Sequence, residues 1–162
     1  YKAMNENKNI GTLRLFSPFG DYEDKGRLIP DLILGSLINK TVKLANPDAV
    51  RDYIYIEDVC DVYMKILKSP EKIKGEIFNL GYGKQQSVQF MAETVKKLIS
   101  EDVKLKYNEV NGRKADTDIW VADIEKIKKV FDWKPKYDMK MGLKKSIEWF
   151  QNNLNLYEIK EK

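Results

Sequence analysis

Apolar residues recur at two different spacings along this chain, and the change from one to the other predicts a mixture of helices and strands. Spacings of three and four residues place apolar side chains on one face of a helix. They predict helices over residues 29–37, 58–68, 88–99, 123–131 and 143–154. Short alternating or continuous apolar runs bounded by turn residues predict strands over residues 11–16, 42–44, 51–56, 77–80 and 103–110. Strands and helices mix along the chain without repeats, so we expect one α/β domain over residues 1–162.

Turn and capping residues predict where these elements begin and end. Ser17-Pro18-Phe19-Gly20 has the composition of a tight turn and should end the first strand. Asp58, Ser87 and Asp123 each stand at the expected start of a helix, where a side-chain oxygen can accept from a free backbone amide. Trp133-Lys134-Pro135 should separate the last two helices, because proline cannot continue a helix.

The composition suits one soluble domain with a sizeable core. The chain has 162 residues and a mass of 19.0 kDa, with 43% hydrophobic and 33% charged residues. It contains no apolar run of membrane-spanning length and no secretory signal, so we expect a cytoplasmic protein without membrane contact. The opening Tyr1-Lys2-Ala3-Met4 reads like the interior of a longer sequence.

Two residue types narrow the possible chemistry. The single cysteine, Cys60, excludes an internal disulfide and should be an inert packing residue within its predicted helix. The chain contains no histidine, which excludes histidine-based triads and histidine-ligated metal sites within it. No serine or cysteine nucleophile has a base partner, and no carboxylate cluster has the spacing of metal ligands. The residues alone therefore predict neither a catalytic group nor a metal site.

The charges favour a small anionic ligand over a nucleic acid. The 29 basic and 25 acidic residues give a net charge of +4, and the two signs are interspersed. Lys126-Ile127-Lys128-Lys129 and Lys144-Lys145 lie in helical patterns, where we expect solvated faces. Nucleic-acid binders usually concentrate their charge on one stripe. A small basic nucleic-acid-binding domain nevertheless stays open as one hypothesis.

The segment Arg51-Asp52-Tyr53-Ile54-Tyr55 carries the strongest candidate chemistry. Arg51 stands at the mouth of an alternating strand with aromatic hydroxyls beside it. A guanidinium group offers a fixed fork of donors and keeps its charge at any physiological pH. We therefore expect a clamp for a phosphate or pyrophosphate at Arg51.

Other candidates have a simple structural interpretation beside the functional one. Gly81-Tyr82-Gly83-Lys84-Gln85-Gln86 invites a dinucleotide-binding interpretation, but the third glycine of that fingerprint is replaced by Gln86, which favours a tight turn. Arg113 and Asp116 are either part of an exposed charged loop or a second arm that meets the ligand of Arg51. Arg27 is most simply a solvated side chain. The tryptophans are expected to be core and turn anchors: Trp120, Trp133 and Trp149.

Four segments, in this order and spacing, resemble the C-terminal half of the NAD-dependent nucleotide-sugar epimerase/dehydratase family, the extended short-chain dehydrogenase/reductases. The match covers nearly the whole chain. The segments are Leu13-Arg14-Leu15-Phe16-Ser17-Pro18-Phe19-Gly20, Arg51 to Val59, Asn79-Leu80-Gly81-Tyr82-Gly83, and Arg113-Lys114-Ala115-Asp116 with Ala122-Asp123 and Trp133-Lys134-Pro135. The resemblance implies part of a Rossmann-type enzyme that forms the substrate-binding lobe.

The resemblance implies substrate contacts for several of these residues. The residues that match Arg51 and Arg113 grip the diphosphate of a sugar nucleotide in the family. Tyr53 and Asp116 match positions beside the nucleotide and its ribose. Arg27-Leu28-Ile29-Pro30 matches the segment that wraps the base and sugar.

Cofactor contacts are implied for the turn at Ser17-Pro18-Phe19. That turn passes between the nicotinamide of NAD or NADP and the sugar, so Ser17 is also implied to contact the substrate. Many members have asparagine where this chain has Ser17, which changes the side-chain contact expected there. The Gly81 turn matches a late strand-to-helix connection and not the cofactor loop.

The family's catalytic residues are expected upstream of Tyr1. Its glycine-rich NAD loop and its Tyr-x-x-x-Lys pair belong to the N-terminal half, and the adjacent Tyr1-Lys2 is not that pair. We therefore expect the nucleotide-sugar-binding part of an NAD(P)-dependent epimerase or dehydratase acting on an NDP-hexose through a 4-keto intermediate. The expected partners are the N-terminal half of the same enzyme and a second copy in a homodimer. The alternative is a non-catalytic module that holds a nucleotide or nucleotide sugar.

Overall fold

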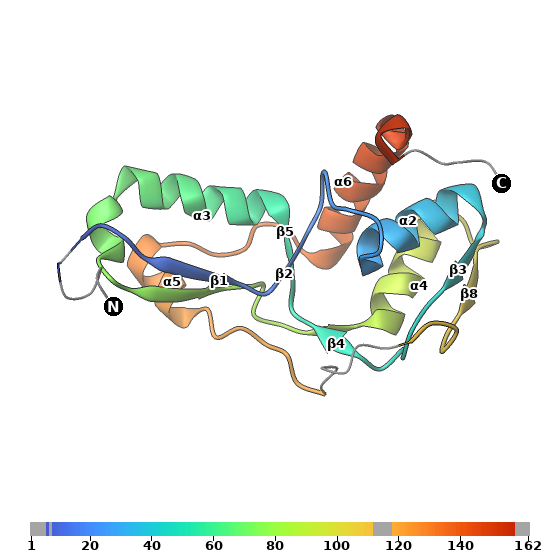
Figure 1. The fold of residues 1–162 in the computed structure, drawn as a ribbon, viewed down its shortest axis with the longest axis horizontal. Coiled ribbons are helices and arrows are strands. Elements are labelled where there is room, and N and C mark those ends of the chain that lie inside the picture. The colour runs from blue at the N-terminus through green and yellow to red at the C-terminus, as the bar shows by residue number, and fades with distance from the viewer. Residues whose placement is uncertain (1–5, 7, 112–117, 158–162) are drawn as a thin grey trace.

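The computed structural model describes residue 6, residues 8–111 and residues 118–157. The described strands form two-stranded sheets. Figure 1 shows β1 near α3 and α5, and β3 and β8 at the edge of the molecule beside α2 and α4. Three of these pairs are parallel: β1 (Thr12–Leu15) with β6 (Ile77–Leu80), β2 (Ser17–Phe19) with β5 (Tyr53–Tyr55), and β3 (Thr41–Lys43) with β8 (Lys104–Lys106). The short strands β4 (Val50–Arg51) and β7 (Gln86–Ser87) are antiparallel.

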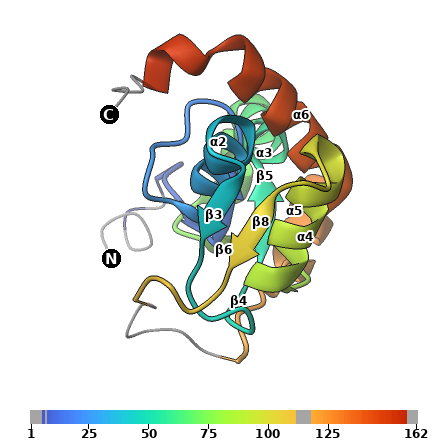
Figure 2. The ribbon, with the colours of Figure 1, turned by 90° about the vertical axis from the view of Figure 1, so that its right-hand side faces the viewer.

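The helices lie in two groups on either side of β5. α3 (Ile56–Lys68) and α5 (Glu125–Phe131) pack around β1 and β6 at one end of the molecule (Figure 1). α2 (Leu28–Ile38), α4 (Val88–Ile99) and α6 (Met139–Asn152) form the other end. Figure 2 shows α2 and α4 beside β3 and β8. The short 3₁₀ helices η1 (Pro70–Ile73) and η2 (Leu154–Tyr157) follow α3 and α6.

β5 joins the two hydrophobic clusters because its side chains alternate between them. Tyr53 and Tyr55 belong to the cluster of α2, α4 and α6, whereas Ile54 belongs to the cluster of α3 and α5. Successive residues of a strand point to opposite faces, so one three-residue strand can anchor both. Ile54 is fully buried, and burying such a side chain contributes about 1.5–3 kcal/mol. The residues just before β5 are thereby fixed relative to both ends of the molecule.

The α/β class and the predicted helices are confirmed, with differences at their ends. Ser87 caps α4 as predicted, and its hydroxyl accepts from the Phe90 amide at 3.1 Å. α5 begins at Glu125, after the N-cap residue Ile124, and Asp123 instead accepts from the Glu125 amide at 3.0 Å. α6 begins earlier than expected because Asp138 caps it through the Met141 amide at 2.8 Å.

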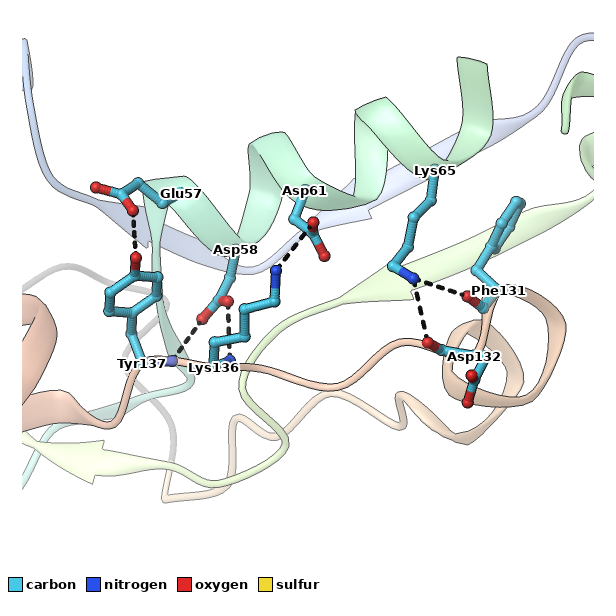
Figure 3. Close-up of polar contacts among 8 residues, drawn as sticks. All are labelled: Glu57, Asp58, Asp61, Lys65, Phe131, Asp132, Lys136 and Tyr137. Carbon is cyan, nitrogen blue, oxygen red and sulfur yellow. Dashed lines mark hydrogen bonds and ion pairs between the residues drawn. The ribbon is translucent and has the colours of Figure 1, made fainter. Parts of the chain in front are cut away.

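Asp58 does not cap α3, contrary to the prediction. The helix begins at Ile56, so Asp58 lies within its first turn and is fully buried. Its carboxylate accepts from the backbone amides of Lys136 at 2.9 Å and Tyr137 at 3.2 Å, as Figure 3 shows. The aspartate therefore ties the connection between α5 and α6 to α3.

Three other expectations were wrong locally. Ser17-Pro18-Phe19 forms strand β2 and not a turn, because it pairs in parallel with β5. The strand expected over residues 103–110 shortens to β8, since Asn108 takes a left-handed backbone conformation with φ of 59°. Cys60 is exposed on α3 and is not a packing residue. No helix among residues 8–111 and 118–157 is both long and apolar enough to cross a membrane.

Candidate functional site

A pocket of about 210 Å³ lies where β2, the loop before α2, the first turn of α2, β4 and β5 meet. Its walls also include Lys43 at the end of β3, Leu44 and Ala45 after it, and Val110 and Asn111. The sequence-predicted residues that the structure describes all line it: Ser17, Pro18, Phe19, Arg27, Leu28, Arg51 and Tyr53. Arg113 and Asp116 lie outside the described residues.

Strand pairing brings residues from distant parts of the chain to this pocket. Ser17 stands opposite Tyr53 in the β2–β5 register, and its amide donates to the Asp52 carbonyl at 3.1 Å. Arg51 precedes this contact by one residue and pairs with Gln86. The β2–β5 pairing therefore brings Ser17 to Tyr53, and Arg51, two residues before Tyr53, lines the same pocket.

Arg51 is held against an aromatic ring. Its guanidinium carbon lies 5.1 Å from the ring centroid of Trp120, and one of its nitrogens donates to the Val50 carbonyl at 2.6 Å. The Trp120 ring also meets Phe16 edge-on, with centroids 6.1 Å apart. A guanidinium over an indole gains a cation–π attraction and loses rotational freedom. Trp120 is 38% exposed, so the prediction of a core anchor was wrong for this residue, whereas Trp133 is buried as expected.

Gln85 holds Trp120 in this position. Its side-chain carbonyl accepts from the Trp120 amide at 2.9 Å, and its side-chain amide donates to the Asp118 carbonyl at 3.1 Å. Both groups of one amide side chain are thereby used to attach residues 118–120 to the turn after β6. The segment that ends at Trp120 is thus fixed on the side nearest Arg51.

Asp52 is a residue whose role sequence reasoning missed. It is fully buried, and its carboxylate accepts from the amides of Tyr82 at 2.7 Å, Gly83 at 3.0 Å and Ala122 at 2.9 Å. Burial raises the pKa of this carboxyl, and the hydrogen bonds from the three amides oppose that rise. A charged residue inside an alternating strand was the available signal, since such a residue must find partners when it is buried. Asp52 fixes the turn and the Trp120 segment around Arg51.

Arg27 and Glu23 form an ion pair in the part of the pocket wall that the loop before α2 provides. The Arg27 Nε lies 2.7 Å from the Glu23 Oε1, and the Arg27 side chain is half exposed. Arg27 is therefore solvent-accessible, as the sequence suggested, but it is paired with a carboxylate. Burial raises the pKa of Glu23 to about 7, although the charge and hydrogen bond of Arg27 oppose the rise.

A second polar cluster lies where α3 meets the segment before α6 (Figure 3). The Tyr137 hydroxyl donates to Glu57, and Lys145 pairs with the other Glu57 oxygen at 2.7 Å. Hydrogen bonds from Lys145 and then Tyr137 hold the pKa of Glu57 below its usual range. The Tyr137 ring packs edge-on against Tyr55, with centroids 4.9 Å apart. Through this ring contact the cluster supports Tyr55 of β5, the strand that also carries the pocket residue Tyr53.

The sequence model of the family described as GDP-mannose 4,6 dehydratase matches residues 5–146 of this chain. The chain belongs to the NAD-dependent nucleotide-sugar epimerase/dehydratase family, the extended short-chain dehydrogenase/reductases. It is 32% identical over 155 residues to a UDP-glucuronate 4-epimerase of Thermodesulfobacterium geofontis, a match that covers 91% of this chain and 45% of that protein. A dTDP-glucose 4,6-dehydratase of Escherichia coli is 28% identical over 147 residues, which cover 86% of this chain and 40% of that protein.

Solved structures agree with this assignment. The crystal structure of dTDP-glucose 4,6-dehydratase from Bacillus anthracis, in complex with NAD, superposes with a TM-score of 0.77 at 26% identity. That match covers 88% of this chain and 44% of the dehydratase. The fold is therefore that of Rossmann-type members of the family. The chain spans less than half the length of the relatives that it matches.

The cofactor of the family is NAD, and only part of this chain fits it. The Gly81 turn does not fit a dinucleotide phosphate, because the amides of Tyr82 and Gly83 already donate to Asp52. A side chain at Gly81 would also meet Asp52 and Ala122, so this glycine serves close packing. Pro18 and Phe19, by contrast, form walls of the pocket and also of a second cavity beside Asp21 and Ile56. Because Pro18 and Phe19 line both cavities, they fit a position between one ligand group in the first cavity and another in the second.

Proposed function

We propose that this chain supplies the nucleotide-sugar-binding part of an NAD(P)-dependent epimerase or dehydratase that acts on an NDP-hexose through a 4-keto intermediate. The observation that carries this proposal is the convergence of Arg51, Tyr53, Ser17 and Arg27 on one pocket. A diphosphate is the ligand group that best suits Arg51, because a guanidinium forms paired, charge-assisted hydrogen bonds with phosphate oxygens. Each such bond typically contributes about 1.5–3 kcal/mol.

The remaining walls would hold the rest of the ligand. Tyr53 lies beside Arg51 and can contact the nucleotide, while Ser17 can contact the sugar. Arg27 and Leu28 would enclose the ligand from the first turn of α2. Arg113 and Asp116, if they act as in the relatives that the sequence resembles, would add a second cation for the diphosphate and an acceptor for ribose hydroxyls.

NAD or NADP, when bound, would supply a hydride acceptor and donor for the sugar carbon. Ser17, Pro18 and Phe19 would form the protein surface between its nicotinamide ring and the sugar. Their role is to orient the two groups and to exclude water, which converts binding energy into alignment. The proton transfer belongs to a Tyr-x-x-x-Lys pair that we place in a segment ahead of residue 1, so residues 1–162 alone would be inactive.

The same proposal covers the assembly and location of the protein. The N-terminal half of the enzyme would pack on this lobe and complete the cleft, and two copies would form a homodimer. A reducing, cytoplasmic setting suits a lone exposed cysteine, Cys60.

Calorimetry on the complete gene product tests the ligand class. Titrations with UDP-, CDP-, dTDP- and GDP-hexoses, and with the matching nucleoside monophosphates, should show saturable binding of at least one diphosphate-linked sugar. The monophosphates should bind more weakly, since they lack the second phosphate group. Single-stranded DNA at two salt concentrations is the control, because nucleic-acid binding falls steeply with salt. Failure of every nucleotide sugar to bind, or salt-sensitive DNA binding in its place, would refute the proposal.

A further inference from the structure

Lys43 is an exposed cation in the wall of the pocket. Arg27, another cation of this wall, is paired with Glu23 at 2.7 Å, which offsets its charge. Asp31, the other acid of the wall, accepts from a backbone amide at 2.9 Å. Lys43, by contrast, forms no ion pair with any carboxylate that the structure describes. Its positive charge is therefore available to a ligand.

The pairing of β3 with β8 places a second lysine beside Lys43. Lys43 stands opposite Lys106 in the parallel register, and the two strands lie side by side (Figure 2). Val42 and Leu105, the residues before them, pack into the core cluster of α2, α4 and α6, so both lysines lie on the outer face. Like charges at opposed positions of paired strands repel each other. An anion bound at Lys43 would offset this repulsion.

The backbone beside Lys43 is held by two hydrogen bonds. The Leu44 amide donates to the Lys106 carbonyl at 2.8 Å, and the Leu44 carbonyl accepts from the Glu109 amide at 3.0 Å. The Glu109 carboxylate nevertheless forms no ion pair with a lysine of the described part of the chain. Lys43 therefore starts from a fixed strand end, while its flexible four-carbon side chain can follow a ligand.

We propose that Lys43 is a further binding residue for the diphosphate of the nucleotide sugar, to which its ammonium group donates at a phosphate oxygen. This inference rests on the proposed function of the pocket, whose wall contains both Lys43 and Arg51. Both phosphate groups of a nucleotide sugar are ionised at neutral pH, so one arginine leaves a negative charge unmatched. Arginine binds phosphate as a planar fork and lysine as a point charge, so the two residues can contact different oxygens.

The matched variants are Lys43→Gln, Lys43→Arg and Lys106→Gln in the complete gene product. Lys106→Gln removes the same charge from the paired strand, at a residue outside the pocket wall. In calorimetry at low salt, Lys43→Gln should weaken nucleotide-sugar binding about three- to tenfold. Lys43→Arg, which keeps the charge, and Lys106→Gln should both stay within about twofold of the wild type. The loss in Lys43→Gln should shrink at high salt, because salt screens exposed charges.

Thermal unfolding of the unliganded proteins separates a binding role from a folding defect. Lys43→Gln and Lys106→Gln each remove the repulsion, so each should raise the midpoint by about 1–2 °C. The double variant should gain no more than either single variant, because one substitution is enough to remove the repulsion. Weaker binding together with a lower midpoint in Lys43→Gln would assign the weakening to the fold and overturn the binding role.

Fragments of the ligand locate the contact. Lys43→Gln should weaken binding of the nucleoside diphosphate and of the whole nucleotide sugar, but not of the free nucleoside, measured by displacement. Equal weakening for the nucleoside would place Lys43 at the base or ribose and overturn the phosphate contact. Wild-type affinity of Lys43→Gln for the nucleotide sugar would overturn the role of Lys43 while leaving the proposed function intact. Absence of nucleotide-sugar binding by the wild type would overturn both proposals.

Discussion

The Asp52 carboxylate accepts a hydrogen bond at 2.9 Å from the backbone amide of Ala122, which lies 70 residues later in the sequence. The same carboxylate binds the amides of Tyr82 and Gly83. One buried acid thus joins the connection between β4 and β5 to the turn after β6 and to the segment that carries Trp120. Arg51, the preceding residue, is positioned between the elements that Asp52 connects.

Asp52→Asn should destabilise the protein strongly. The substitution keeps the shape but replaces one acceptor oxygen with an NH₂ group, which would face backbone donors inside the core. We expect a loss of about 2–4 kcal/mol in the free energy of unfolding, measured by urea denaturation. Asp48→Asn, at an exposed position in the loop before β4, should change it by less than about 0.5 kcal/mol. Equal effects of the two substitutions would contradict the role assigned to Asp52.

Asp58 allows a second test, because its carboxylate connects α3 to the segment before α6. Asp58 is fully buried and binds two backbone amides, whereas Asp61, one turn further along α3, pairs with Lys136 at 3.1 Å on a partly exposed side chain. Asp58→Asn should cost about 2–4 kcal/mol, and Asp61→Asn about 0–1 kcal/mol, because an exposed ion pair contributes little. Thermal and urea unfolding of both variants check the order. A larger effect of Asp61→Asn would contradict the role assigned to Asp58.

Trp120 should support ligand binding through Arg51. Trp120→Ala removes the ring beneath the guanidinium, which is worth about 0.5–1 kcal/mol at an exposed site, so nucleotide-sugar affinity should fall about two- to fivefold. Trp120→Phe should retain most of the affinity, because it keeps an aromatic face. Ile119→Ala, at a neighbour that is 75% exposed, is the control and should bind as the wild type does. If Trp120→Ala also binds normally, Arg51 does not depend on the ring.

Stability should fall with rising pH through the titration of Glu23. Its pKa is raised from 4.5 to about 7, so the folded state holds more protons than the unfolded state between these values. The stabilisation from this group is complete below about pH 4.5 and is lost as the pH rises through about 7. The shift corresponds to about 3 kcal/mol. In urea denaturation from pH 5 to 8, the wild type should lose stability relative to Glu23→Gln, and a constant difference would refute the assignment.

Most of the fold could be predicted from local patterns. Three features depend only on neighbouring residues and could therefore be predicted directly: the periodic apolar faces of the helices, the cap at Ser87, and the interruption by Pro135 before α6. The ends that were predicted wrongly depend on distant partners. Asp58 looks like a cap in sequence, but its carboxylate binds amides 78 and 79 residues away. Ser17-Pro18-Phe19 looks like a turn, but pairing with β5 makes it a strand.

The candidate site was predictable where residue chemistry and family resemblance agreed. Arg51, Tyr53, Ser17 and Arg27 were expected to act together, and the structure places them around one pocket. Residues whose roles depend on tertiary contacts were missed. Asp52 and Gln85 act through backbone groups of other segments, and Glu23 acquires its shifted pKa only when the loop before α2 is buried. Such contacts join distant segments, so the spacing of neighbouring residues in the sequence does not indicate them.

Calorimetry on Arg51 variants of the complete gene product tests most directly whether Arg51 binds the diphosphate of a nucleotide sugar. Arg51→Ala should weaken nucleotide-sugar binding about ten- to a hundredfold, and Arg51→Lys should fall between Arg51→Ala and the wild type because it keeps the charge but loses the fork. Lys97→Ala, which removes one exposed charge from α4, should bind within about twofold of the wild type. NAD affinity should be unchanged in all three variants. Wild-type affinity of Arg51→Ala for the nucleotide sugar would contradict the account.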